Sequence, residues 1–236
     1  GQDTLTHTKK EGFSFGAIPV FAFDTDVGLK TGFAVNFYHF GNGEQYPKYD
    51  HSLFIKWYRT TKFSNLSQII FDSNKLLPNI RLTSEFSYIN DKQLDFYGFN
   101  GSSSYYNKLF TDNSEGNNQY ISKLYYKHER SLLRFKTDIQ SKIGSSNFGW
   151  LAGFSFNKFM ISSVNRDAIN DRIMKDDEIL PDTASLYEKY VEWGVINERE
   201  RSGGNNHFLK VGIIYDNRDR ECNCNDGIWT EAMFLY

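Results

Sequence analysis

Residue types that commonly bind metals or act as nucleophiles are few in this chain and widely spaced. The two cysteines, Cys222 and Cys224, are separated by one residue, a spacing at which a disulfide would be strained. A metal site would need further ligands nearby. The histidines, however, are scattered along the sequence: His7, His39, His51, His128 and His207. We therefore interpret the cysteines as ordinary turn residues and predict no metal site and no cofactor.

A hydrolytic site would need a serine, a histidine and an orienting polar group brought together. His128 and His207 fall in segments expected to be strands, but no flanking pattern marks a nucleophile near either of them. The sequence therefore predicts no catalytic residues and a protein that is not an enzyme. A lipase is kept only as an alternative, which lipase activity dependent on either histidine would support.

Charged residues gather near the C-terminal end, where an aliphatic segment runs into Asp216, Arg218 and Asp219. At the end of a strand these side chains can form a charge-assisted hydrogen-bond network that fixes a turn. Gly227 can then supply a positive φ before the final segment. Surface turns of many proteins are rich in the same residue types, so the pattern alone indicates a turn.

The strands that would position this turn are predicted from the alternation of apolar and polar residues. In the segment 80–88, Ile80, Leu82, Phe86 and Tyr88 share one parity, and polar residues occupy the other. Successive side chains of an extended chain point to opposite faces, so such a segment has one apolar face and one polar face. The segments 133–140 and 149–157 repeat the pattern, although a soluble sandwich would also alternate.

The amino-acid composition narrows the class of protein to which the chain can belong. The 236 residues carry a formal charge of -2, which argues against a nucleic-acid binder, and 17% of them are aromatic. A mean hydropathy of -0.56 does not exclude a membrane barrel, whose strands have one polar face. The longest plainly apolar run, 17–23, is far shorter than the roughly 18 residues that a membrane helix needs.

We expect a polar lead-in over residues 1–12 and one domain over residues 13–236. Strands are expected at 13–23, 29–40, 51–62, 66–73, 79–89, 118–129, 131–142, 148–163, 207–215 and 228–236. Turns are expected at 24–28, 128–131 and 143–147. The long connections 90–117 and 164–206 leave opposite ends of this strand set, so either a strand is missed within 90–117 or one long loop lies on the side of the short turns.

The second long connection carries helix signals between Pro181 and Gly194. Asp182 or Thr183 can cap the N-terminus, and Gly194 can end the helix. Such a helix either packs over the base of its own loop or docks a partner.

The turn region resembles the barrel of the BamA/TamA superfamily, also called the bacterial surface antigen family. In that family an aliphatic strand ends in an Asp-x-Arg-Asp turn, and the chain restarts after a glycine; here Asp216, Arg218, Asp219 and Gly227 occupy those places, while cysteines replace the family's aromatic residue and proline. The segment 18–32 is similar to the opening hairpin of short members that lack periplasmic repeats. The segment 97–101 is similar to their aromatic-Gly-x-Gly-Asn turn, with Asn100 and Gly101 in reverse order.

The resemblance implies an antiparallel transmembrane β-barrel, or the first half of a sixteen-stranded one, in the bacterial outer membrane after removal of a signal peptide. Gly1 in place of Met is consistent with such processing. A half barrel alone in lipid would leave two open strand edges. The remaining strands must come from further sequence, from another chain, or from closure as a smaller barrel.

The resemblance also implies a function, namely assisting insertion or export of proteins or lipids at a weakly paired seam. The candidate seam strand is 13–23, in which Gly16 and Pro19 both weaken pairing. The expected partners are outer-membrane lipid and outer-membrane proteins or clients. The alternative is a passive pore or scaffold that binds other outer-membrane or surface proteins through its long loops.

Overall fold

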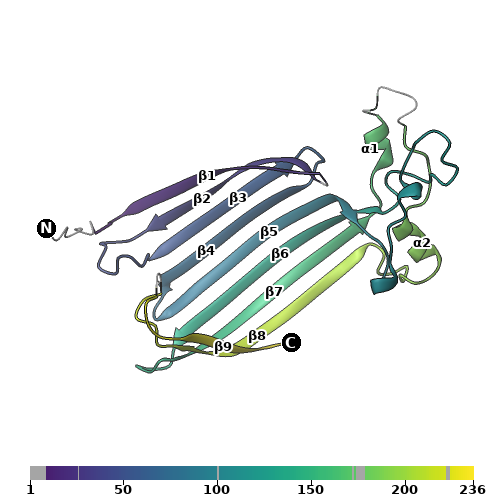
Figure 1. Ribbon diagram of the computed structural model, residues 1–236. Coiled ribbons are helices and arrows are strands. Elements are labelled where there is room, and N and C mark those ends of the chain that lie inside the picture. Colours follow the sequence, from purple (N-terminus) through teal and green to yellow (C-terminus); the bar gives the residue numbers. More distant parts are fainter. Residues whose placement is uncertain (1–8, 26, 100, 172, 174–178, 222–223) are drawn as a thin grey trace.

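The computed structural model describes residues 9–25, 27–99, 101–171, 173, 179–221 and 224–236. Within these residues, nine strands form one sheet in which each strand pairs antiparallel with its neighbours in sequence (Figure 1). The strands are β1 (Phe13–Asp24), β2 (Gly28–His39), β3 (His51–Thr60), β4 (Asn65–Leu77), β5 (Ile80–Asp95), β6 (Lys127–Lys142), β7 (Phe148–Ser162), β8 (Gly203–Asp216) and β9 (Trp229–Leu235). The prediction of an all-β, antiparallel fold of the kind that builds a barrel, or half of one, is confirmed.

The helices are short and lie in the two longest connections. They are η1 (Gly101–Ser103), η2 (Lys108–Phe110), α1 (Arg166–Asn170) and α2 (Leu186–Glu192). In the part of the chain that the structure describes, no helix has both the length and the apolar character to cross a membrane.

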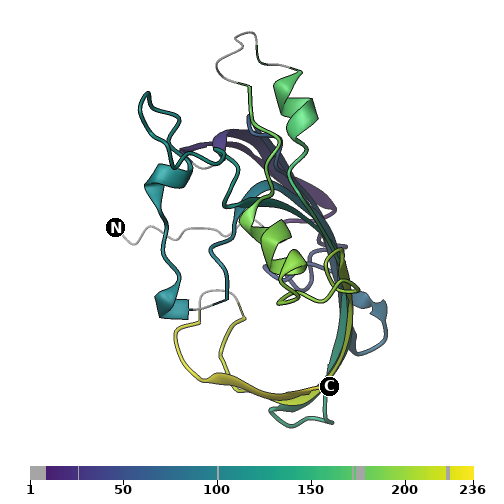
Figure 2. The ribbon, with the colours of Figure 1, turned by 90° about the vertical axis from the view of Figure 1, so that its right-hand side faces the viewer.

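Viewed along its strands, the sheet is an open arc with β1 and β9 at its two ends (Figure 2). Paired residues share a face, so the register defines rows of side chains that run across the sheet. One row is apolar over five strands and consists of Ile55, Ile69, Phe86, Phe135 and Phe156. The neighbouring row on the other face is polar and lists as Lys56, Gln68, Ser87, Arg134 and Asn157.

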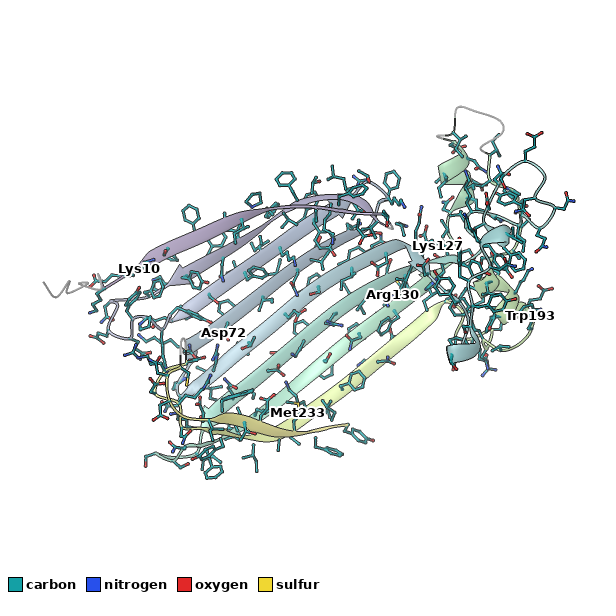
Figure 3. The ribbon with its side chains drawn as sticks, viewed as in Figure 1. Lys10, Asp72, Lys127, Arg130, Trp193 and Met233 are labelled. Carbon is teal, nitrogen blue, oxygen red and sulfur yellow. The ribbon has the colours of Figure 1, made fainter. Side chains whose placement is uncertain are left out.

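The apolar rows lie on the convex face and the polar rows on the concave face. Side chains splay apart on a convex surface and crowd together on a concave one. Accordingly, Ile69 is 45% exposed and Phe86 46%, whereas Ser87 is 1% exposed. Rings project outward along the edges of the sheet (Figure 3). The arrangement is the reverse of a soluble sandwich, in which the apolar faces meet.

Two sequence predictions about the middle of the chain were wrong. Residues 118–126 form turns instead of a strand, and 128–131 form no turn because they continue β6, which begins at Lys127. Tyr125 and Tyr126 are buried in the structure over the sheet's end, so their aromatic surface is used in packing that the strand pattern did not reveal. With the extra strand removed, both long connections leave the same end of the sheet.

We call that end the cap end, because residues 96–126 and 163–202 fold over it and carry the four short helices of the described residues (Figure 1). At the opposite end, the turn end, lie the connections 40–50, 78–79, 143–147 and 217–228. The cap contains the two clusters of buried apolar residues in the described chain. They are Leu124, Val164 and Leu180, and Tyr187, Tyr190 and Ile196.

Candidate functional site

The strand β1 is an edge strand, paired only with β2 through an unbroken register of twelve residue pairs. Just before it, the N–H of Phe40 donates to the carbonyl of Gly12 at 2.8 Å, which makes Gly12 and Phe40 a hydrogen-bonded pair. Hydrogen-bonded and non-bonded pairs alternate along an antiparallel ladder. The even-numbered residues of β1 therefore bond to β2, and the odd-numbered residues direct their backbone groups to the free edge.

Pro19 is one of the residues that face the free edge. Proline has no N–H, so its presence there costs no bond to β2 and interrupts the row of free donors. The remaining donors at this edge are the N–H groups of Phe13, Phe15, Ala17, Phe21 and Phe23. Gly16 has no side chain with which to pack, and nothing lies within 4 Å of where a Cβ would be at this position. The strand is therefore held less firmly there.

The concave face of β1 also differs from that of its neighbours. It carries Gly16, Ile18, Val20 and Ala22, none of them polar. The row that begins at Ile18, by contrast, is polar from β3 to β6, where it consists of Lys56, Gln68, Ser87 and Arg134. Ile18 is 68% exposed. A strand that is apolar on both faces is typical of one covered on both sides, so β1 has the composition of a strand with a further contact still to be made.

The other edge strand, β9, runs in the same direction as β1, because successive strands of this sheet alternate in direction and both are odd-numbered. Direct pairing of the two edges would therefore be parallel. A second copy in the same orientation would meet the same obstacle, since its β1 would lie parallel to β9. An all-antiparallel closed barrel needs an odd number of additional strands, which argues against the smaller closed barrel considered from the sequence.

The residues Asp216, Arg218, Asp219 and Gly227 are brought together in the connection 217–228. The Asp216 carboxylate accepts from Nε and Nη2 of Arg218 at 2.9 and 3.0 Å. The Asp219 carboxylate accepts from the N–H groups of Asn225 and Asp226 at 3.1 and 3.3 Å, and these backbone bonds hold its pKa below the usual value. Gly227 has a φ of 101°.

A side chain at position 227 would be excluded, because its Cβ would lie 2.6 Å from the Cα of Arg218. Of the two cysteines, Cys224 is a free, exposed thiol, whereas Cys222 lies outside the described residues, as does Asn100. In the described chain, no group of three or more His, Cys, Asp or Glu residues could hold a metal ion.

The connection 217–228 stands over the concave face (Figure 2). It extends to the turn end of β4 and β5 (Figure 1). Its Glu221 forms an ion pair with Arg81, the second residue of β5. Arg81 in turn donates through Nε and Nη2 to Asp72 of β4, both at 3.0 Å. Asp72 is 6% exposed and also accepts from Tyr49 at 2.9 Å and from Thr83. Figure 3 labels Asp72 at this end of the sheet.

Beside this network lies an open cavity of about 940 Å³ at the turn end, lined by Arg81, Gln140, Asp216, Arg218 and Glu221 among others. Sequence reasoning found the Asp216 turn but missed Asp72, Arg81 and Glu221. Their only sequence signal is that Asp72 and Arg81 flank the short turn between β4 and β5 on the polar parity. Nothing in the sequence shows that a residue 140 positions away reaches Arg81.

The cap is organised around α2. Its N-cap is Ser185, which forms a reciprocal capping box with Glu188. The prediction that Asp182 or Thr183 caps this helix was therefore wrong. The Glu188 carboxylate accepts from the N–H of Ser185 and from the hydroxyl of Ser163, both at 2.7 Å. Burial raises the pKa of Glu188, but these hydrogen bonds outweigh it, and the pKa lies below its usual value.

We expect Glu188→Gln to lower the local stability of α2 by about 0.3–1 kcal/mol, because glutamine keeps the capping-box acceptor but loses the negative charge that stabilises the helix N-terminus. A carboxyl with a depressed folded pKa stabilises above its unfolded pKa, and the contribution is lost as pH falls through the folded value. Amide hydrogen exchange of residues 186–193, corrected for intrinsic rates, should show this loss below about pH 4.5 in the native chain and at all pH values in the variant. The exposed Glu192→Gln in the same helix is the control, and equal effects of the two changes would contradict the prediction.

The two histidines considered for hydrolysis lie apart, on different strands and faces. His128 of β6 packs between Phe96 and Tyr187 in the cap, with ring centroids 5.9 and 5.4 Å away. His207 of β8 contacts Phe154 and Phe156 on the convex face. The described chain therefore does not bring these two histidines into one site.

No protein-family model matches the chain, and no curated protein matches it. Among solved structures, the chain is similar to the crystal structure of BamA from Haemophilus ducreyi lacking POTRA domains 1–3, with 13% sequence identity and a TM-score of 0.40. The match covers 95% of this chain and 34% of that one, so this chain spans about a third of the length of that structure. A likeness at this identity and score does not assign the chain to a family.

Proposed function

We propose that the chain forms part of the wall of an outer-membrane β-barrel and that the free edge of β1 receives strands of client proteins during their insertion or export. The observation that carries the membrane placement is the convex apolar face. Its central row is apolar from Ala17 of β1 to Phe156 of β7. Eight strands have 10 to 16 residues, enough to cross a bilayer when tilted. The two longest connections, 96–126 and 163–202, lie at the same end of the sheet, which fits the same placement.

The assembly role rests on the β1 edge. Unpaired backbone groups in hydrocarbon cost several kcal/mol each, so an edge held in a membrane favours the addition of a strand. Pro19 keeps that pairing incomplete, and the apolar concave face of β1 offers a second contact for an incoming strand. An edge with these properties binds a strand and releases it again, as a site of insertion or export must.

The test removes donors from the free edge without touching the bonds to β2. In the variant Ala17→Pro/Phe21→Pro, the edge keeps only the donors of Phe13, Phe15 and Phe23. We expect client assembly to fall by roughly tenfold or more, since two hydrogen bonds of about 1 kcal/mol each are lost. The measurement is the rate at which an outer-membrane client becomes folded in vesicles that contain the protein.

The matched control is Phe21→Ala, which removes a side chain but keeps the N–H. It should retain assembly, while both variants keep heat-modifiable migration on gels. Unchanged assembly in the double-proline variant would rule out strand addition at β1.

A scaffold role is the second candidate, favoured by the cap. Trp193, Val195 and Tyr105 are 60, 58 and 74% exposed in the cap, so their apolar surface is available to a partner protein. Figure 3 labels Trp193 at the outer side of the cap. In that case Trp193→Ala would weaken binding of a surface protein, and the double-proline variant would not.

A further inference from the structure

A groove on the convex face, at the cap end, lies outside the edge and the turn discussed above. It has a volume of about 800 Å³ and lies where β3 to β6 reach the base of α1. Its walls combine two kinds of surface. Trp57, Val164 and Ile169 are apolar, and Arg59, Lys62 and Lys92 are cationic.

The cations stand at the end of an apolar stripe. Leu53, Ile55, Trp57 and Arg59 share the convex parity of β3, so the stripe passes from aliphatic to aromatic and then to charged as it approaches the cap. In membrane proteins this order marks the passage from hydrocarbon to headgroups. The groove therefore lies at headgroup level if the convex face contacts lipid.

The charge of the groove is not balanced by the described residues around it. Lys92 is paired with Glu129, Nζ to Oε2, at 2.7 Å. Arg59 is exposed and stacks over the Phe63 ring at 5.5 Å, and Lys62 donates to the carbonyl of Thr25 at 2.8 Å. In the described part of the chain, neither Arg59 nor Lys62 forms an ion pair with a carboxylate, so two cationic groups remain for a ligand.

We propose that this groove binds a membrane lipid whose phosphate headgroup carries a net negative charge, with the phosphate between Arg59 and Lys62 and an acyl chain along Trp57 and Ile55. A guanidinium and an ammonium match a phosphate in charge and donor geometry. The adjoining apolar stripe matches an acyl chain and has no complement in a free anion. The inference rests on the proposed membrane placement, because only a membrane presents such a lipid at that height.

The test uses the chain in a non-ionic detergent, with three probes followed by native mass spectrometry: dihexanoyl phosphatidic acid, dihexanoyl phosphatidylcholine and inorganic phosphate. We expect phosphatidic acid to bind at least roughly tenfold more tightly than either other probe, the factor given by about one charge-assisted hydrogen bond. In the variant Arg59→Gln/Lys62→Gln, the preference over phosphatidylcholine should disappear.

The matched control is Lys30→Gln/Lys56→Gln, which removes the same charge from the concave face of β2 and β3 and should keep the preference. Equal binding of the two lipids, or equal loss in both double variants, would overturn the proposal. Inorganic phosphate binding as tightly as phosphatidic acid would also overturn it, since the site would then be a plain anion site. A chain that stays monodisperse without detergent would instead refute the membrane placement itself.

Discussion

Replacing Ile69 by lysine should cost the protein about 2–4 kcal/mol of stability in a bilayer, the depth-dependent cost of a cation on the lipid face of a barrel. Ile69 lies in the middle of β4 on the convex face, between Ile55 and Phe86, and is 45% exposed. In a water-soluble protein, a lysine at such an exposed position would change stability by about 0.5 kcal/mol or less. Denaturant unfolding in lipid vesicles measures the difference.

The adjacent residue supplies the control. Gln68 points to the concave face and donates to Glu85 at 3.0 Å, so a lysine there would be placed to pair with that carboxylate. Gln68→Lys and Ile69→Lys add the same charge at the same depth. We expect the first to be tolerated and the second to lower folding yield. Equal tolerance of both would show that the convex face does not contact hydrocarbon.

Removing Arg81 should produce a loss of similar size at the turn end. Among the described residues, Arg81→Met leaves the Asp72 carboxylate, 6% exposed, with the hydroxyls of Tyr49 and Thr83 as its only partners. Breaking a buried pair from one side costs about 3 kcal/mol, because the remaining charge stays desolvated. The variant also frees Glu221 and with it the connection that stands over the concave face. Chemical unfolding of the variant gives the stability change.

Two further variants separate this effect from a general loss of charge. Asp72→Asn added to Arg81→Met should restore part of the stability, because it removes the unpaired carboxylate. Arg130→Met breaks an ion pair with Asp91 at 2.8 Å whose side chains are 38 and 30% exposed, so it should cost about 1 kcal/mol or less. Figure 3 places Arg130 near the cap end. Similar losses in Arg81→Met and Arg130→Met would contradict the prediction.

Alternation was sufficient to predict the sheet because its signal is local. A strand with one apolar face shows period two whichever strands it pairs with, and each of the nine observed strands overlaps an expected segment. The tenth expected strand, 118–129, was wrong over residues 118–126, where Tyr125 and Tyr126 contribute to packing within the cap. Aromatic residues favour strands in general, but tertiary contacts decided their structure here.

The direction of the apolar face could not be predicted from alternation, which is the same in a sandwich and in a barrel. The direction in which the apolar face points depends on the curvature of the sheet, and that curvature is set by all nine strands together. The turn residues Asp216, Arg218 and Gly227 were found because they are close in sequence. Arg81 and Glu221 were missed because their contact depends on how far the arc brings β5 toward the 217–228 connection.

Pro19 has a consequence for how long a guest strand would stay. It divides the free edge of β1 into one stretch with the donors of Phe13, Phe15 and Ala17 and another with those of Phe21 and Phe23. A guest strand can detach from one stretch while the other stretch still binds it. The free-energy barrier to its dissociation is therefore set by the longer stretch and not by the whole edge. A guest strand would therefore dissociate faster than it would from an uninterrupted edge of equal length.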